Sequence, residues 1–322
     1  MLLIVYSANI PSVLSRGAVV CLLSAAAFGA MGIFGKLAFD DGATPGTLLA
    51  ARFAIAAVAL WCLMLMKGSL SQMRAVAPRD LTIALGLGAC GYALQAGCYF
   101  VALEHLDASL LSLVLYTFPA IVTVAAVALG RERLDRRRVL ALGLVSTGLV
   151  LILATAGAST VNGVGVALGL GAAFTYSAYI LISDGVARRV PALTLATLVC
   201  TGAAVSLTVG SALTGQLRPG DVTLAGWGWL ACIAVVSTVA AITLFFAGLS
   251  RVGPTSASIL STFEPVVTVV LAAAVLAEHL APIQLAGGAF VLTAVLVLRV
   301  GPRHRAAHKS ARPVSSLLAE TH

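Results

Sequence analysis

One carboxylate lies where an apolar membrane helix would be expected. Glu264 stands directly before Pro265 inside the otherwise apolar run from Pro254 to Ala277. A lone charge at the centre of a membrane helix costs about 2.5–3.5 kcal/mol on insertion scales, and such residues usually face a bundle interior or a water-filled cavity. The proline removes an amide donor, which is tolerated where other helices or water satisfy the freed carbonyl. Glu264 and Pro265 therefore predict a kink that faces a polar path.

Two cations also lie within apolar runs. Arg52 is about 10 Å from the helix start at Pro45, deep enough that a permanent charge needs a partner or water. We expect it to line a cavity, and snorkelling to the interface is the alternative. Lys36, near the end of the first run, is a site candidate that snorkelling and pairing with Asp40 one turn later explain more simply.

Polar residues, most of them tyrosines, recur on single helix faces. Three of them follow the spacing i, i+3, i+7, which places them on one side of a helix. Such residues either line a pocket or form hydrogen bonds between packed helices, and the sequence leaves both open. The candidates are Tyr92, Gln95, Tyr99, Tyr116, Tyr176 and Tyr179.

The composition shows which elements must position these residues. Of 322 residues, 60% are hydrophobic and 10% charged, and the mean hydropathy is +1.04, which indicates an integral membrane protein in a lipid bilayer. The net charge of +8 comes mostly from short loops and a tail, so nucleic-acid binding is a poor explanation. All six cysteines lie in apolar segments, and we expect neither a metal nor a cofactor.

Hydropathy predicts an all-α protein with ten transmembrane helices. A span needs about 20 apolar residues. We expect an N-terminal arm over 1–16 and a basic, disordered cytoplasmic tail over 301–322. The predicted spans are 17–38, 45–66, 81–103, 108–129, 137–156, 163–183, 191–213, 223–249, 254–277 and 282–300.

The basic residues predict the orientation. Loops on one side, together with the tail, hold 17 of the 20 lysines and arginines, the loops on the other side hold only Arg218, and two lie within spans. Because cytoplasmic loops carry the excess of positive charge, both termini are expected in the cytoplasm.

The two halves of the chain are related by a constant shift. An offset of 146 residues pairs Pro45 with Pro191, among others, and pairs Pro119 with Pro265, the two prolines at which we expect helix kinks. This predicts a first repeat over 17–157 and a second over 163–300, each of five helices. Because each repeat has an odd number of spans, the two repeats must lie in the membrane in opposite orientations. Inverted repeats of this kind are an architecture of secondary transporters, in which the substrate site lies near the midplane.

At this point the chain resembles the drug/metabolite transporter superfamily, and within it the ten-helix EamA-type permeases, over residues 17–300. The matching segments are Gly35-Lys36, Ala51-Arg52-Phe53, Tyr116-Thr-Phe-Pro119 with Glu132, and Thr262-Phe-Glu-Pro265 with Glu278. The chain departs from the pattern at Phe118, where many members carry an acidic residue, so a mechanism with two carboxylates is in doubt.

The resemblance implies a multi-pass permease of the inner (plasma) membrane that carries small metabolites, often amino acids and often outward. Glu264 would bind a cationic group of the substrate or carry a coupling proton; alternatively it is a protonated carboxyl that steadies the kink at Pro265. Because the spans contain no zinc motif, aspartate pair or histidine, an intramembrane enzyme is not expected. A non-transporting scaffold or sensor derived from a carrier fold is the alternative function.

Overall fold

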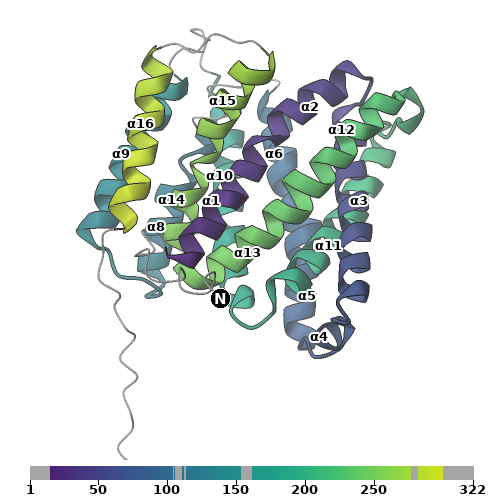
Figure 1. The fold of residues 1–322 in the computed structure, drawn as a ribbon, viewed down its shortest axis with the longest axis horizontal. Coiled ribbons are helices and arrows are strands. Elements are labelled where there is room, and N and C mark those ends of the chain that lie inside the picture. Colours follow the sequence, from purple (N-terminus) through teal and green to yellow (C-terminus); the bar gives the residue numbers. More distant parts are fainter. Residues whose placement is uncertain are drawn as a thin grey trace, which may run out of the picture.

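The computed structural model describes residues 15–103, 105, 111, 114–153, 162–276 and 282–299. The predicted tail and nearly all of the N-terminal arm therefore lie outside the described residues. The described chain is helical throughout and contains no strand. It forms a bundle in which most helices run roughly along one direction (Figure 1).

The first half holds a long helix, α3, between shorter helical pieces. α3 covers Pro45–Met66, as the sequence predicted, because Thr44 caps its first turn and Pro45 suits the first helical position. The other elements are α1 (Arg16–Gly29), α2 (Met31–Asp40), α4 (Leu70–Arg74), α5 (Pro78–Gly86), η1 (Leu87–Tyr92), α6 (Ala93–Leu103), α8 (Phe118–Ala128) and α9 (Arg136–Leu153).

The second half follows the same order. Asn162 caps its first helix by accepting bonds from the Val164 and Gly165 amides, and Thr223 caps α12 through the Gly226 amide. Its elements are α10 (Gly163–Ala187), α11 (Ala192–Leu213), η2 (Pro219–Asp221), α12 (Leu224–Ala234), η3 (Val235–Ala240), α13 (Ala241–Val252), α14 (Pro254–Ser261), α15 (Glu264–Leu276) and α16 (Pro282–Arg299).

Six helical stretches are long and apolar enough to cross a membrane. Shorter apolar helices cover Phe118–Ala128 and Leu285–Val297. The long stretches are Arg16–Asp40, Pro45–Met66, Pro78–Tyr99, Gly163–Ala187, Ala192–Leu213 and Leu224–Val252. An integral membrane protein is therefore the fold class, whereas ten crossings in two inverted repeats remain a prediction.

Several predicted spans are not regular helices. The first is interrupted at Ala30, between α1 and α2, where the Thr268 hydroxyl donates to the carbonyl of Gly29. The span predicted over 254–277 turns at Thr262 and Phe263, directly before Glu264 and Pro265. The third and eighth spans contain six-residue π-helical segments, η1 and η3. The sequence predicted a proline kink but neither the π segments nor the interruption at Ala30.

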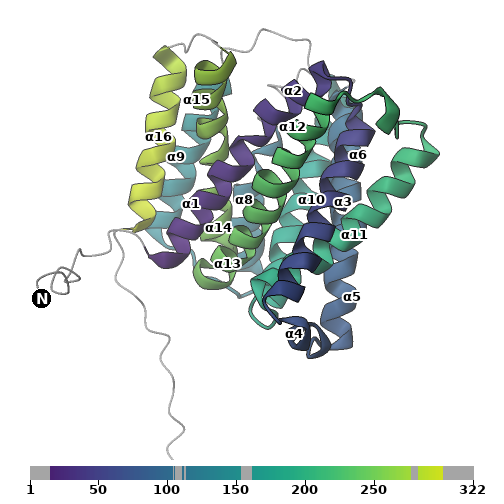
Figure 2. The same cartoon turned by 45° about the vertical axis from the view of Figure 1, so that its right-hand side comes forward.

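Equivalent helices of the two halves pack across the molecule. α1 lies against α13 and α15, and α10 lies against α6 and α8, which is the same pairing after a shift of 146 residues. α9 packs along α16, and α3 along α11, at opposite sides of the bundle (Figures 1 and 2). Close approach depends on small residues: a Cβ on Gly88 would overlap the Val199 carbonyl oxygen, and one on Gly202 would overlap that of Leu85.

Polar contacts join the halves at both ends of the bundle. At one end, the Asp80 carboxylate accepts two bonds from the Arg189 guanidinium, at 2.6 and 3.0 Å. These hydrogen bonds raise the pKa of Arg189, which lies in a loop, above its usual value. At the other end, Asp41 accepts bonds from the Thr223 hydroxyl at 3.0 Å and the Trp229 indole at 3.2 Å. None of these contacts was predicted from the sequence.

Candidate functional site

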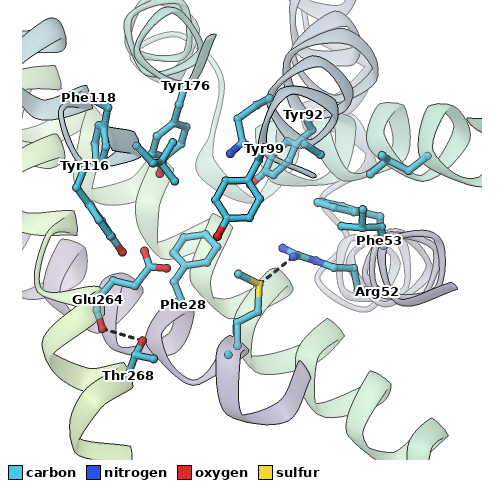
Figure 3. A pocket seen from close by; sticks show the side chains of 17 residues that line it. Phe28, Arg52, Phe53, Tyr92, Tyr99, Tyr116, Phe118, Tyr176, Glu264 and Thr268 are labelled. Carbon is cyan, nitrogen blue, oxygen red and sulfur yellow. Dashed lines mark hydrogen bonds between the residues drawn. The ribbon is translucent and has the colours of Figure 1, made fainter. Parts of the chain in front are cut away.

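A cavity of about 350 Å³ lies between the helices of the two halves. It is bounded by residues of α1, α2, α3, η1, α6, α8, α10, α11 and α15, and by the segment before α8 (Figure 3). Its walls are largely aromatic. Seven of the nine predicted site residues line it: Arg52, Tyr92, Gln95, Tyr99, Tyr116, Tyr176 and Glu264.

Arg52 enters the cavity from α3 and is only 5% exposed. Its terminal NH1 lies 2.8 Å from the sulfur of Met31, and its guanidinium carbon lies 4.6 Å from the centre of the Phe53 ring. Among the described residues no group accepts from the buried Nε. A thioether is a weak acceptor, so the Arg52 guanidinium has no strong acceptor among the described residues.

Glu264 faces Arg52 from the opposite wall. It is the first residue of α15, and its carboxylate points into the cavity beside Tyr116 and Phe28 (Figure 3). Thr268, one turn later, donates both to the Glu264 carbonyl at 3.1 Å and to the Gly29 carbonyl at 3.0 Å, which ties α15 to the end of α1. Within the described chain no hydrogen bond or ion pair joins Glu264 to Arg52. The cavity thus holds a guanidinium and a carboxyl group that do not contact each other.

The aromatic wall forms a connected cluster. Tyr92 packs edge-on against Phe53 with ring centres 4.9 Å apart, and Phe118 packs edge-on against Tyr176 at 4.7 Å. Such rings present flat apolar faces that also attract cations. Phe118, where the resemblance led us to look for an acidic residue, fills space between rings rather than adding a second charge.

Two predicted site residues lie elsewhere, and the two prolines begin helices. Tyr179 is buried behind the wall, with its ring centre 5.4 Å from that of Tyr92, and it does not line the main cavity. Lys36 is exposed on α2, outside the cavity lining. Pro119 and Pro265 each occupy the second position of a helix, α8 and α15.

Sequence reasoning missed several lining residues. Thr268 could have been found, because it lies one helical turn after Glu264 on the same face. Phe28 and Met31 carry no such signal, since both are ordinary in an apolar helix. No group of three or more histidine, cysteine, aspartate or glutamate residues that could hold a metal occurs in the described part of the chain.

Comparison with known proteins relates the chain to transporters. Residues 15–154 and 163–300 each match the EamA-like transporter family. The chain is 27% identical over 279 residues to an uncharacterized transporter, YcbK, of Bacillus subtilis (strain 168), covering 85% of this chain and 89% of that protein. It is 28% identical over 283 residues to an uncharacterized transporter of Archaeoglobus fulgidus, covering 87% and 95%.

The fold also matches a solved structure. One crystal structure of a protein superposes with a TM-score of 0.74 over 88% of this chain and 96% of the other, at 19% sequence identity. At that identity the likeness supports the fold alone. The two separate family matches fall on the two predicted repeats.

Proposed function

The chain belongs to the EamA-like transporter family, and from this premise we propose that it is a secondary transporter of small zwitterionic metabolites, amino acids or related compounds. A membrane transporter is what the family and the relatives support directly. The substrate class, export as the direction, and alternating access between two inverted five-helix repeats are our proposal.

The observation that carries the proposal is the pair of separated charges in one cavity. A substrate carboxylate would accept two parallel bonds from Arg52, since a guanidinium fork matches carboxylate geometry. An ammonium group would reach Glu264 and the surrounding rings, which attract cations. A ligand with both groups satisfies both walls at once, whereas a singly charged one leaves the other charge unpaired in a poorly solvated site.

The same carboxyl is the candidate for ion coupling. Glu264 is the only Asp or Glu residue among those that line the described cavity. A proton taken up there when the substrate leaves, and released when the substrate returns, would link transport to the proton gradient. The ammonium group of the substrate and the proton would then compete for the Glu264 carboxyl. We place the protein in the plasma membrane with both termini in the cytoplasm, as the distribution of basic loops favours.

Transport by purified protein tests the proposal. Full-length protein in lipid vesicles is given a panel of labelled L-amino acids and related zwitterions, with protein-free vesicles as control, and with and without a pH gradient. We expect saturable movement of at least one zwitterion, competition by other zwitterions, and little competition by the matching amine or carboxylic acid. If no compound moves although the protein is folded and inserted, the non-transporting scaffold or sensor replaces the carrier.

A further inference from the structure

Met31 is the described residue that holds the Arg52 side chain by a polar contact. It is the first residue of α2, directly after the interruption at Ala30, and its sulfur lies 2.8 Å from Arg52 NH1. Figure 3 draws this contact at Arg52 as a dashed line. The long, unbranched thioether side chain fits an irregular space that a β-branched residue would not fill.

The Met31 sulfur is a weak acceptor for a donor as strong as the Arg52 guanidinium. A guanidinium normally binds carboxylates or carbonyl oxygens, and a thioether sulfur accepts poorly. The Phe53 ring adds an attraction to the cation, yet within the described chain Nε has no acceptor. Because buried donors without partners are costly, Arg52 would move to a better acceptor if one came within reach.

Glu264 is that better acceptor. Both side chains line the same cavity, and opposite charges attract more strongly where water is scarce. If they met, each would satisfy the other, and neither would remain for a substrate. Some feature of the structure must therefore favour the separated arrangement.

The segment from Gly29 to Met31 lies against the backbone at Glu264 and against the Arg52 guanidinium. On one side, a Cβ at Gly29 would lie 2.8 Å from the Glu264 carbonyl oxygen, and the Thr268 hydroxyl binds the Gly29 carbonyl. On the other side, two residues later, Met31 binds Arg52. The start of α15 and the Arg52 guanidinium are thus both in contact with the same three-residue segment.

We propose that Met31 is a positioning residue that holds the Arg52 guanidinium apart from Glu264 and so keeps both charges available to a zwitterionic substrate. The proposal rests on the proposed function for the substrate, but the separation itself is a property of the empty protein. Replacing the sulfur by a group that cannot accept a hydrogen bond should release Arg52 towards Glu264. An amide oxygen at the same place should retain it.

A thermal double-mutant cycle on the full-length protein in detergent tests this without any substrate. Arg52→Gln, Glu264→Gln and the double variant are made in four backgrounds: wild type, Met31→Leu, Met31→Gln, and Met64→Leu as a control in a buried methionine of α3. In wild type, Met31→Gln and Met64→Leu, the two Tm shifts should add to within about 2 °C. In Met31→Leu they should depart from additivity by about 4 °C or more.

The other outcomes overturn the proposal. Coupling in wild type as large as that in Met31→Leu would mean that the two groups already pair, or that Met31 does not separate them. Equal coupling in Met31→Leu and Met31→Gln would show that an acceptor is not what matters. Should Met31→Leu not fold, Met31→Ala, which also lacks the sulfur, takes its place in the cycle.

A measurement of transport distinguishes a failure of this inference from a failure of the proposed function. For any zwitterion that the vesicle panel identifies, Met31→Leu should raise KM about tenfold, with kcat little changed and with recovery in Met31→Gln. If the panel finds no substrate while the thermal cycle behaves as expected, the proposed function fails and the positioning role of Met31 stands. If a substrate is found but KM is unchanged in Met31→Leu, the positioning role fails.

Discussion

At the scale of single residues, Arg52 and Glu264 are held in the cavity in different ways. Arg52 is enclosed by a ring and a sulfur, and Glu264 starts a helix whose backbone is tied to α1 through Thr268. A neutral hydrogen bond contributes about 0.5–1.5 kcal/mol, and one to a charged group about 1.5–3 kcal/mol. A substrate that meets both charges therefore gains from groups that the empty protein leaves unsatisfied.

The first prediction concerns the planar shape of the charged group of Arg52. Arg52→Lys keeps the charge but loses the planar fork, so KM should rise about tenfold to a hundredfold, the equivalent of one lost charge-assisted hydrogen bond. Initial rates in vesicles at matched protein content measure it. Arg218→Lys, at an exposed arginine outside the cavity, is the matched control and should behave as wild type. Wild-type kinetics in Arg52→Lys would return Arg52 to a purely structural role.

The second prediction concerns the ionisable group of Glu264. Glu264→Gln keeps shape and hydrogen bonding but cannot ionise, so accumulation against a gradient should be lost and the pH profile of transport should flatten. Asp221→Asn, at an exposed carboxylate, should leave both unchanged. Loss of binding itself would identify a substrate ligand rather than a coupling group. An unchanged rate and pH profile would leave the carboxyl only a structural part in the kink.

The charged part of the site could be predicted from the sequence, and its neutral part could not. Arg52 and Glu264 stand out because a charge in an apolar run is costly. The tyrosines on helix faces were candidates because their spacing places them together. Met31 and Phe28 belong to the apolar background, and their spacing carries no signal that separates them from the rest of that background. The bond from Thr268 to the Gly29 carbonyl joins residues 239 apart, which the sequence could not reveal.

At the scale of elements, the crossing of η1 and α11 sets how closely the halves approach. Gly88 and Gly202 each face the backbone of the partner helix without room for a methyl group. Gly88→Ala should therefore lower the Tm in detergent by several degrees, in line with the ~1–3 kcal/mol that overpacking costs. Gly86→Ala, where nothing described lies within 4 Å, is the control. Equal Tm values for the two variants would show that the crossing relaxes freely.

Regular helices were predicted well and irregular ones poorly. The span 45–66 agrees with α3 to the residue because cap, proline and apolar run coincide. The π-helical segments were not predicted because a single extra residue in a helical turn leaves the hydropathy pattern unchanged. Cross-helix contacts, such as that between Asp80 and Arg189, could not be predicted because they join residues 109 apart.

At the scale of the whole molecule, the open question is orientation. The loop charges place Gln72 in the cytoplasm and Gly220 outside, and both positions are exposed. In a background without native cysteines, Gly220→Cys should react with an impermeant thiol reagent applied to intact cells, and Gln72→Cys should react only after lysis. The reverse pattern would invert the protein in the membrane. Labelling of both from outside would contradict the odd number of predicted spans, five, between them.

The π segment η1 has a consequence for insertions and deletions. A π turn holds one residue more than an α turn, and each residue advances a helix by about 100°. Loss of the single codon for Cys90, which does not line the cavity, should restore an α-helix and rotate Gln95 and Tyr99 by about 100° relative to Asp80. The variant should keep its helix content yet lose transport. This short segment therefore tolerates no change of length.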